Sequence, residues 1–410
     1  MTKTNNQFFN LEKKMAAGIY IHIPFCIKKC FYCDFFSLPL DDYKLRREYA
    51  RALIYEAAFY GERYGKNLKA DTVFFGGGTP SLMEPGLIAR IMESLNKNFD
   101  IASDAEITME CNPATLTPEK LKGYRAAGIN RLSIGAQSFN DEVLQKLGRI
   151  HKAEDIEKTF DLARQAGFDN MNMDLMFAVP GLTLKEWRKT IKQALGMKPE
   201  HISFYSLEIS EETVFGHMVS EGKMKETPVE KDRRMYHEAL EMLKKAGFNH
   251  YEISNAALPK RECRHNLKYW SFSDYLGLGA SAHSFINKVR FSNVGEVNQY
   301  ISAMDRQDMA KGSRLGDSDV MGAGCIDYFH VNSAMDSIAE YTFTALRTKK
   351  GVDFEDFEKR FKIYFWDVFG KERSMFEEYV RNGYACSDSR HIALTCKGID
   401  ISNKIMALFV

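Results

Sequence analysis

The sequence predicts an α/β fold: a partial, open (β/α)6 barrel followed by a small, mostly helical α+β C-terminal domain. Six short β patterns alternate with amphipathic helical patterns over roughly the first 250 residues. Such alternation is typical of parallel strands joined by right-handed helical crossovers. Six units are too few to close an eight-stranded barrel, and the alternation fades after about residue 250. An open barrel is the architecture that accommodates both observations.

The elements of the barrel follow from hydrophobic periodicity. The strands are predicted at 18–24, 72–78, 105–111, 131–137, 172–181 and 201–209. The helices are predicted at 42–64, 81–99, 117–128, 156–167, 184–196 and 230–247, where apolar residues recur at helical spacing and Gly or Pro marks several ends. In parallel α/β folds the ligand site lies at the carboxyl ends of the strands, so we expect the site there.

The chain divides into four predicted parts. Residues 1–16 form a polar N-terminal extension, and 17–250 form the partial barrel. Residues 251–310, rich in aromatic side chains and Gly, extend the barrel. Residues 311–410 form a helical cap domain with a short β piece at 391–395.

Charge and composition exclude several classes of partner. The chain carries 56 basic and 55 acidic residues, a net charge of +1, which gives no electrostatic footprint for nucleic acid. No apolar stretch is long enough for a transmembrane helix, and the N-terminus lacks the apolar core of a secretory signal. We therefore expect a cytoplasmic protein with free thiols. Among its eight cysteines, five scattered ones are expected to be small buried side chains: Cys111, Cys263, Cys325, Cys386 and Cys396.

The other three cysteines form a cluster directly after the first strand. Cys26, Cys30 and Cys33 have the spacing Cys-x3-Cys-x2-Cys in IHIPFCIKKCFYCDFFS. Three thiolates on one short loop can hold three irons of a [4Fe–4S] cluster and leave the fourth iron open to the amino and carboxylate groups of S-adenosylmethionine (SAM). A Cys3His zinc site that includes His22 is the alternative. Zinc sites usually draw their ligands as separated pairs, so the spacing favours the cluster.

The residues around these cysteines carry a family resemblance. The string YIHIPFC-x3-C-x2-CDF resembles the coproporphyrinogen III dehydrogenase and heme chaperone branch of the radical SAM superfamily. The resemblance implies that the barrel is a radical SAM barrel carrying a [4Fe–4S] cluster and SAM. It also implies that Tyr20 and Tyr32 contact SAM, although ordinary packing would equally explain two aromatic residues.

Further SAM contacts are implied at the ends of successive strands. In the family, the segment matching GGGTPS (76–81) holds the SAM amino group, and a carboxylate matching Glu110 binds the ribose hydroxyls. The remaining matches contact SAM or a second ligand molecule. The full set implied for SAM is Tyr20, Tyr32, Gly77, Gly78, Thr79, Glu110, Gln137, Arg149, Asp174 and His283. Charged and amide groups at several barrel strand ends are hard to explain as core packing.

Two features indicate which group within this branch the chain resembles more, the oxidases or the heme chaperones. The oxidase branch carries a further cysteine two residues beyond the third, where this chain has Phe35. The string HNLKYW resembles the heme-binding motif of HemW-type heme chaperones and makes His265, Asn266, Tyr269 and Trp270 heme candidates. Imidazole is a good axial ligand for heme iron, and Tyr and Trp offer flat faces to a porphyrin. Cys263 is an alternative soft ligand, and a structural role for His265 is the competing interpretation.

The resemblance implies a heme chaperone that binds heme, the cluster and SAM and passes heme to hemoproteins such as respiratory enzymes. These partners would bring it transiently to a membrane, and a homodimer is consistent with family precedent. The alternative is an oxygen-independent coproporphyrinogen III oxidase, an oxidoreductase of porphyrin and heme biosynthesis that decarboxylates propionates. A related enzyme that opens or methylates heme has no positive motif in the sequence.

Overall fold

A single large sheet forms the frame of the molecule. The computed structural model describes residues 15–39, 42–305 and 325–410, so most of the expected N-terminal extension and the boundary near residue 311 lie outside the described residues. The sheet's twelve strands run in the order β14-β13-β12-β11-β1-β4-β5-β6-β7-β8-β10-β9. In that order they are Ile326–Val331, Val289–Asn293, His283–Ile286, Asp274–Leu278, Met15–Ile23, Leu68–Gly77, Asp100–Cys111, Arg131–Gln137, Met171–Phe177, His201–Ser206, Asn255–Ala257 and Asn249–Glu252.

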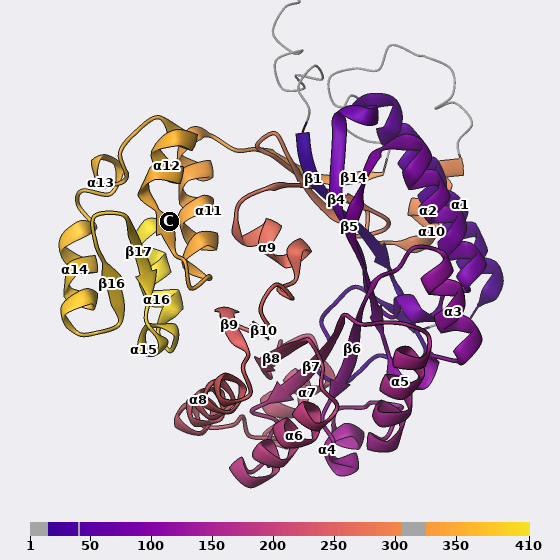
Figure 1. The fold of residues 1–410 in the computed structure, drawn as a ribbon, viewed down its shortest axis with the longest axis horizontal. Helices are drawn as coiled ribbons and strands as arrows, with labels where there is room; N and C mark the ends of the chain where they lie inside the picture. Colours follow the sequence, from indigo (N-terminus) through magenta and orange to yellow (C-terminus); the bar gives the residue numbers. More distant parts are fainter. Residues whose placement is uncertain (1–14, 40–41, 306–324) are drawn as a thin grey trace, which may run out of the picture.

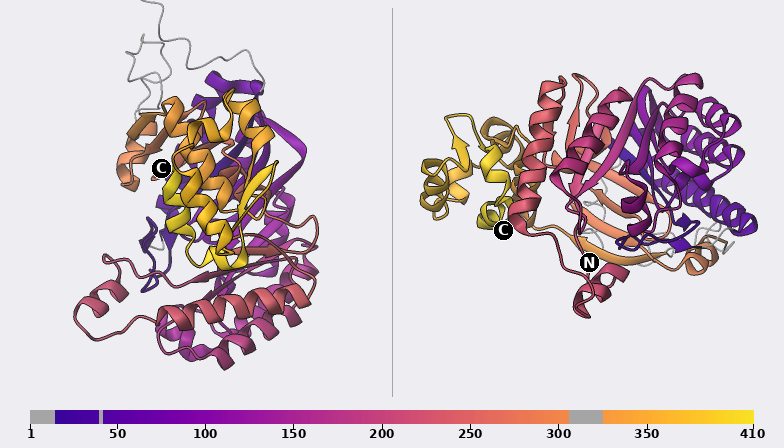
Figure 2. Two further views of the ribbon diagram at one scale, coloured as in Figure 1. Left: turned by 90° about the vertical axis from the view of Figure 1, so that its left-hand side faces the viewer. Right: turned by 90° about the horizontal axis from the view of Figure 1, so that it is seen from below.

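The middle of this sheet is the predicted partial barrel. Strands β1, β4, β5, β6, β7 and β8 pair in parallel, each with the next, and the sheet curves around an open interior (Figure 1). Crossover helices cover its outer face (Figure 2): α1 Tyr43–Tyr64, α2 Pro85–Asn98, α3 Pro118–Ala126, α4 Asp141–Lys146, α5 Ala153–Gln165, α6 Leu184–Gly196 and α8 Val229–Lys245. The predicted fold class is therefore confirmed. Strand β7 stops at Phe177 rather than at residue 181, because Ala178 adopts a left-handed φ of 57° that ends the extended backbone.

The region after residue 250 adds strands that the sequence did not reveal. Strand β11 pairs in parallel with β1, and β12, β13 and β14 continue the sheet as antiparallel neighbours. Strands β11 and β12 approach each other closely, since a Cβ on Gly277 in β11 would lie 2.2 Å from the carbonyl oxygen of His283 in β12. Such close backbone approach is open only to Gly. These short, Gly-rich strands lack a strong alternating pattern, so periodicity did not detect them.

Three short helices belong to the barrel and its extension: α7 Val214–Ser220, α9 Arg264–Trp270 and α10 Val297–Asp305. Helix α9 lies in the open side of the barrel, between the strands and the C-terminal domain (Figure 1). An ion pair of 2.6 Å between Lys268 and Asp71 fixes α9 to the barrel wall, and Glu106 accepts a hydrogen bond from the backbone of His265. Helix α9 therefore fills the barrel interior.

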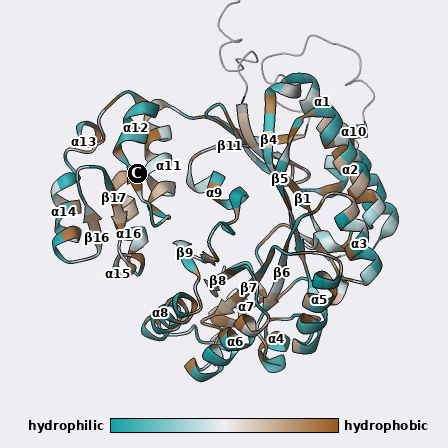
Figure 3. Ribbon diagram, viewed as in Figure 1, coloured by the Kyte–Doolittle hydropathy of each residue, from teal (hydrophilic) through white to brown (hydrophobic). Residues whose placement is uncertain are grey.

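The C-terminal cap has the predicted α+β character. Its helices are α11 Ala334–Leu346, α12 Phe354–Phe361, α13 Phe365–Val368, α14 Arg373–Arg381, α15 Cys396–Ile399 and α16 Ser402–Met406. The expected β piece is β17 His391–Leu394, which lies between β15 Val352–Asp353 and β16 Ala385–Ser387. Strand β14 pairs with the main sheet although it lies beyond residue 311. Buried apolar residues of the barrel and the cap belong to one hydrophobic core, and hydrophobic and hydrophilic residues alternate along the helices (Figure 3).

Three scattered cysteines have the expected environment and two do not. Cys111, Cys263 and Cys325 are buried. Cys386 and Cys396 are exposed, so the expectation of burial was wrong for these two. Both lie at the surface of the small cap, where little of the chain has an interior to enter.

Candidate functional site

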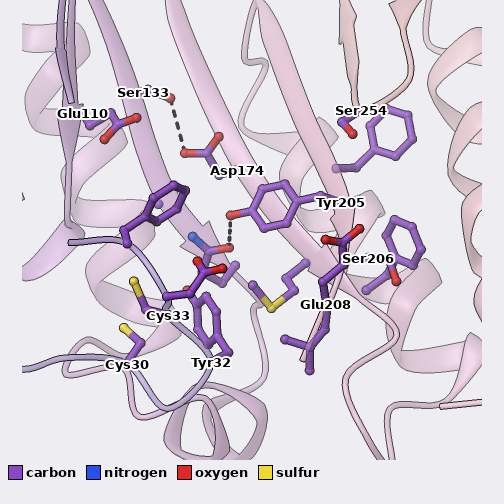
Figure 4. Close-up of a pocket in the computed structure, with 18 of the residues that line it drawn as sticks. Cys30, Tyr32, Cys33, Glu110, Ser133, Asp174, Tyr205, Ser206, Glu208 and Ser254 are labelled. Carbon is purple, nitrogen blue, oxygen red and sulfur yellow. Dashed lines mark hydrogen bonds between the residues drawn. The ribbon is translucent and has the colours of Figure 1, made fainter. Parts of the chain in front are cut away.

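The carboxyl ends of the barrel strands surround a cavity of about 720 Å³, the main cavity (Figure 4). Side chains from β4, β5, β6, β7 and β8 form one wall, the cysteine loop a second and the cap a third. Eleven of the thirteen residues predicted for the cluster and SAM line it: Cys26, Cys30, Cys33, Tyr32, Gly77, Gly78, Thr79, Glu110, Gln137, Arg149 and Asp174. The two others, Tyr20 and His283, do not line it.

The cysteine loop is held against the end of β4 by close backbone contacts. A short parallel pair, β2 Phe25–Cys26 with β3 Leu38–Pro39, closes the base of the loop. A Cβ on Gly78 would lie 2.7 Å from the carbonyl oxygen of Phe25 and 3.1 Å from the Cys26 sulfur. Gly77 has a φ of 113°, which disfavours any other residue. These two glycines therefore let the loop and the strand end meet.

The three thiols fit a cluster better than a single metal ion. All three are free, and they line one cavity. Among the described residues, no three His, Cys, Asp or Glu side chains converge as ligands of one ion do. Thiolates that bind different irons of a cube need no common point. His22 has Nδ1 3.1 Å from the Tyr20 hydroxyl and Nε2 3.1 Å from the Phe36 carbonyl oxygen, and unlike the three thiols it does not line the main cavity, which disfavours the zinc alternative.

Burial favours the protonated form of two of these thiols, Cys26 and Cys33. It raises the pKa of Cys33 to about 11 and raises the pKa of Cys26, where a contact of 3.6 Å with the Thr79 hydroxyl partly opposes the shift. Arg149 lies beside the third thiol, with a guanidinium nitrogen 3.6 Å from the Cys30 sulfur. A positive group at this distance stabilises thiolate charge.

Arg149 also joins the loop to two strand ends. Its guanidinium donates to the carbonyl oxygen of Gly135 at 2.7 Å and to the side-chain oxygen of Asn112. Asn112 in turn donates to the Thr79 hydroxyl at 2.9 Å. This network fixes polar groups from β4, β5 and β6 around one side of the cavity.

Two carboxylates face the cavity from β5 and β7, the strands on either side of β6. The backbone N–H of Gly77 donates to Glu110 at 3.1 Å, and Asp174 accepts from Asn172 at 2.7 Å and from Ser133 at 3.3 Å (Figure 4). Burial raises the pKa of Glu110 to about 8, and the charge of Asp174 adds to the shift. Burial also raises the pKa of Asp174. Carboxylates in such positions accept hydrogen bonds from ligand hydroxyl and amino groups.

Gln137 ends β6 in a strained conformation. Its φ is 62°, which non-glycine residues rarely adopt. Its side-chain oxygen accepts a hydrogen bond of 2.7 Å from the Tyr205 hydroxyl (Figure 4). Strain of this kind is frequent at binding sites, where the surrounding structure compensates its cost.

A second cavity, of about 220 Å³, lies deeper in the barrel. Glu110, Ser133 and Asp174 line both cavities and so form a shared wall. The second cavity is also lined by Tyr20 and by three predicted heme residues on α9, His265, Asn266 and Tyr269. The structure thus places the two predicted residue sets in adjoining cavities.

His265 is buried and fully hydrogen-bonded. Its Nδ1 lies 2.8 Å from the Thr72 hydroxyl, and its Nε2 lies 2.9 Å from the Tyr269 hydroxyl. Burial lowers its pKa to about 3, so the imidazole is neutral. Neutral imidazole is the metal-binding form, but both nitrogens are engaged in this conformation.

Two predicted residues lie apart from these cavities. Trp270 ends α9 with its ring covered by the Arg347 guanidinium, whose carbon is 4.5 Å from the ring centroid. His283 begins β12 and is exposed. Burial is the main cause of the lowered pKa of His22, and repulsion from His283 adds to it.

Sequence reasoning missed several residues of the main cavity. Asn112 and Ser133 lie next to predicted strand-end residues, and their polarity inside apolar strands was a usable signal. Tyr205 had no such signal, because an aromatic residue in a strand is ordinary. The cap residues Arg347 and Asp400 lie far away in sequence, so only the folded structure brings them to this cavity.

Comparisons with known proteins agree with this geometry. The model of the radical SAM superfamily matches residues 20–194, and that of the HemN C-terminal domain matches residues 333–401. Heme chaperone HemW of Bacillus subtilis is 35% identical over 397 residues, covering 95% of this chain and 98% of that protein. Heme chaperone HemW of Escherichia coli is 37% identical over 277 residues, covering 67% of this chain and 71% of that protein.

A solved structure confirms the arrangement of the whole chain. Coproporphyrinogen III oxidase of Escherichia coli superposes with a TM-score of 0.83 at 24% identity, covering 98% of this chain and 92% of the other. At this identity the match establishes the fold, including the cap, and does not establish a shared reaction.

Proposed function

This chain belongs to the HemW heme chaperone family of the radical SAM superfamily, and from that premise we propose that it binds heme, a [4Fe–4S] cluster and SAM and passes the heme to acceptor hemoproteins. The observation that carries the proposal is the 35% identity to the Bacillus subtilis chaperone over 98% of that protein's length. The adjoining cavities support it, since one is suited to the cluster and SAM and the other is lined by the heme motif.

In the main cavity we assign each side chain a binding role. Cys26, Cys30 and Cys33 hold the cluster, which when bound supplies the electron that cleaves the sulfonium bond of SAM. Backbone groups of Gly77 and Gly78 and the hydroxyl of Thr79 orient the amino end of SAM. Glu110, Gln137, Arg149 and Asp174 form hydrogen bonds with the rest of SAM. Tyr20, Tyr32 and His283 make further contacts at its periphery.

For heme we assign the axial position to His265. Its neutral imidazole has the form that binds iron, and the Tyr269 hydroxyl that occupies Nε2 would give way to the iron. Asn266 and Trp270 belong to the same helix, and the indole face that Arg347 does not cover would contact the porphyrin. The proposal therefore includes a local rearrangement at the Tyr269 hydroxyl.

Coproporphyrinogen oxidation remains the competing activity, because the oxidase shares the fold. Phe35 weighs against it. This residue lines the main cavity and is 66% exposed at the position where the oxidase branch carries a further cysteine. A phenyl ring there supplies no thiol, so the loop keeps three sulfur ligands.

The proposed partners follow from heme transfer. Acceptor hemoproteins would include respiratory ones. Where such an acceptor is anchored in a membrane, binding to it would bring the cytoplasmic chaperone to that membrane. Among the described residues, the helices include none that is long and apolar enough to cross a bilayer. We include a homodimer in the proposal.

Anaerobic hemin titration of the wild type, His265→Ala and Tyr269→Phe tests the heme assignment. The wild type should bind hemin with a shifted Soret band, and His265→Ala should lose that shift. Tyr269→Phe removes the hydroxyl that competes for Nε2, so its affinity should equal or exceed that of the wild type. If His265→Ala bound hemin with unchanged affinity and spectrum, His265 would not be the ligand.

A further inference from the structure

The main cavity continues beyond the predicted SAM residues to a second end beneath the cap. This end, the cap end, is lined by side chains of β8, α8, the β9–β10 turn and the cap. Its polar members are Ser206, Glu208, Arg233, Ser254, Arg347, Asp400, Ser402 and Asn403. The same cavity is also lined by apolar and aromatic side chains: Met176, Phe177, Phe204, Tyr205, Leu207, Tyr236, Ile253 and Ile399. This combination of polar and apolar lining is suited to an amphiphilic ligand with an anionic edge.

Arg233 and Arg347 differ in how their charges are compensated. Arg233 is paired with Asp232 and lies 3.6 Å from Asp400. Arg347 has no ion pair of this kind among the described residues, and its Nε is buried without a hydrogen-bond partner there. Burial raises the pKa of its acidic neighbour Glu252, and the positive charge of Arg347 partly opposes that shift. Arg347 is therefore the cation with unused donors at the cap end.

The position of Arg347 is nevertheless well fixed. Its guanidinium stacks over the Trp270 ring at 4.5 Å, an arrangement that leaves the in-plane N–H groups free to donate. Its backbone carbonyl accepts a hydrogen bond of 3.1 Å from Ile253 N–H, which joins the end of α11 to the β9–β10 turn. A fixed, planar cation with free donors is suited to bidentate binding of a carboxylate.

We propose that Arg347 is the carboxylate-binding residue for a porphyrin propionate, and that it links the heme motif on α9 to the cap. Ser254 and Asn403 flank it as further donors. Trp270 lies five residues after His265, a rise of about 7.5 Å along a helix. Contacts connect His265 to Arg347: the Tyr269 hydroxyl lies 2.9 Å from His265 Nε2, the Tyr269 ring lies against that of Trp270, and Arg347 stacks over Trp270. A porphyrin whose iron reaches His265 would extend its carboxylate edge along this path to Arg347. This inference rests on the proposed heme binding. It adds the residue that would distinguish a porphyrin with ionised propionates from one whose propionates carry no charge.

The test compares hemin with hemin dimethyl ester on cluster-reconstituted wild type, Arg347→Gln and Arg373→Gln. Arg373 is the matched control, because it also stacks over a cap tryptophan, Trp366, but does not line the main cavity. Arg347→Gln should bind hemin about tenfold more weakly, or ~1.4 kcal/mol. The control should match the wild type. The diester, which lacks ionised carboxylates, should bind the wild type about tenfold more weakly and should not distinguish the variants.

Each other outcome has a separate meaning. If Arg347→Gln bound hemin as the wild type does, or if the wild type bound both ligands equally, the carboxylate assignment would be wrong. Equal losses for hemin and diester in Arg347→Gln would assign Arg347 to supporting Trp270 instead. The ligand comparison on the wild type needs no variant to fold. Failure of the wild type to bind either ligand would overturn the proposed function itself.

Discussion

At the scale of single residues, the site combines thiols with buried acids that would be unfavourable in an ordinary core. Glu110 and Asp174 face the same cavity, and each raises the cost of ionising the other. Such pairs persist where a ligand uses them, because a buried charge without a partner destabilises the fold. The cation of SAM and its hydroxyl groups are suitable partners for both.

Glu110 should make SAM binding depend on pH. Its pKa is raised from 4.5 to about 8, so the stronger acceptor, the carboxylate, forms only as the pH rises through about 8. Equilibrium dialysis should show SAM affinity rising over that range in the wild type, with Glu110→Gln about tenfold weaker above pH ~8. The titration of SAM itself is common to both proteins, so the difference between the profiles isolates Glu110.

Glu93→Gln, an exposed substitution on α2, is the control for this experiment and should follow the wild type. Parallel wild-type and Glu110→Gln profiles would mean that Glu110 does not contact SAM.

The sequence was informative about residues that carry a strong chemical signal. Cysteine spacing located the three thiols, and the family resemblance added eight further residues that line the main cavity. The hydrogen-bond partners of these side chains could not be predicted from the sequence. Nothing in HNLKYW reveals that Thr72, on a distant strand, and Tyr269 both bond to the His265 ring. Those contacts depend on where α9 enters the barrel, a tertiary property.

At the scale of elements, a buried acid ties α1 to the strands that the sequence did not predict. Glu56 is fully buried and accepts hydrogen bonds from Gly279 N–H at 2.8 Å, from Asn293 at 2.7 Å and from the Tyr300 hydroxyl at 2.6 Å. One side chain thus joins a barrel helix to the β11–β12 turn, β13 and α10. Long-range contacts of this kind hold strands that are too short for hydrophobic periodicity to predict.

Glu56 should make the stability of the apo-protein depend on pH. Burial raises its pKa from 4.5 to about 7, so between these values the folded protein holds a proton that the unfolded chain releases. The stabilisation from this group is complete below about pH 4.5, declines as the pH rises to about 7 and is constant above that. Linkage predicts a decline of about 3 kcal/mol over this window.

Urea unfolding at both ends of the window measures this effect as the difference between the wild type and Glu56→Gln. Glu62→Gln, exposed on the same helix, is the control and should show the wild-type dependence. An identical pH dependence in Glu56→Gln would exclude Glu56 as its source.

At the scale of the whole molecule, the cap forms one wall of the main cavity. Asp400 pairs with His237 at 2.8 Å, Lys349 N–H donates to the Tyr251 carbonyl at 3.0 Å, and Arg360 donates to that of Phe272 at 3.2 Å. These contacts bring cap residues into the main cavity. The barrel and the cap were each predictable from local patterns, whereas the cavity between them required the folded chain.

The central claim is that this scaffold handles heme and does not oxidise coproporphyrinogen III. The most direct test incubates the cluster-reconstituted protein anaerobically with SAM, a reductant and coproporphyrinogen III, with the Escherichia coli oxidase as positive control. We predict that the oxidase forms protoporphyrinogen and that this protein forms none. Formation of protoporphyrinogen by this protein, abolished when Cys26, Cys30 and Cys33 are replaced by Ala, would contradict the account.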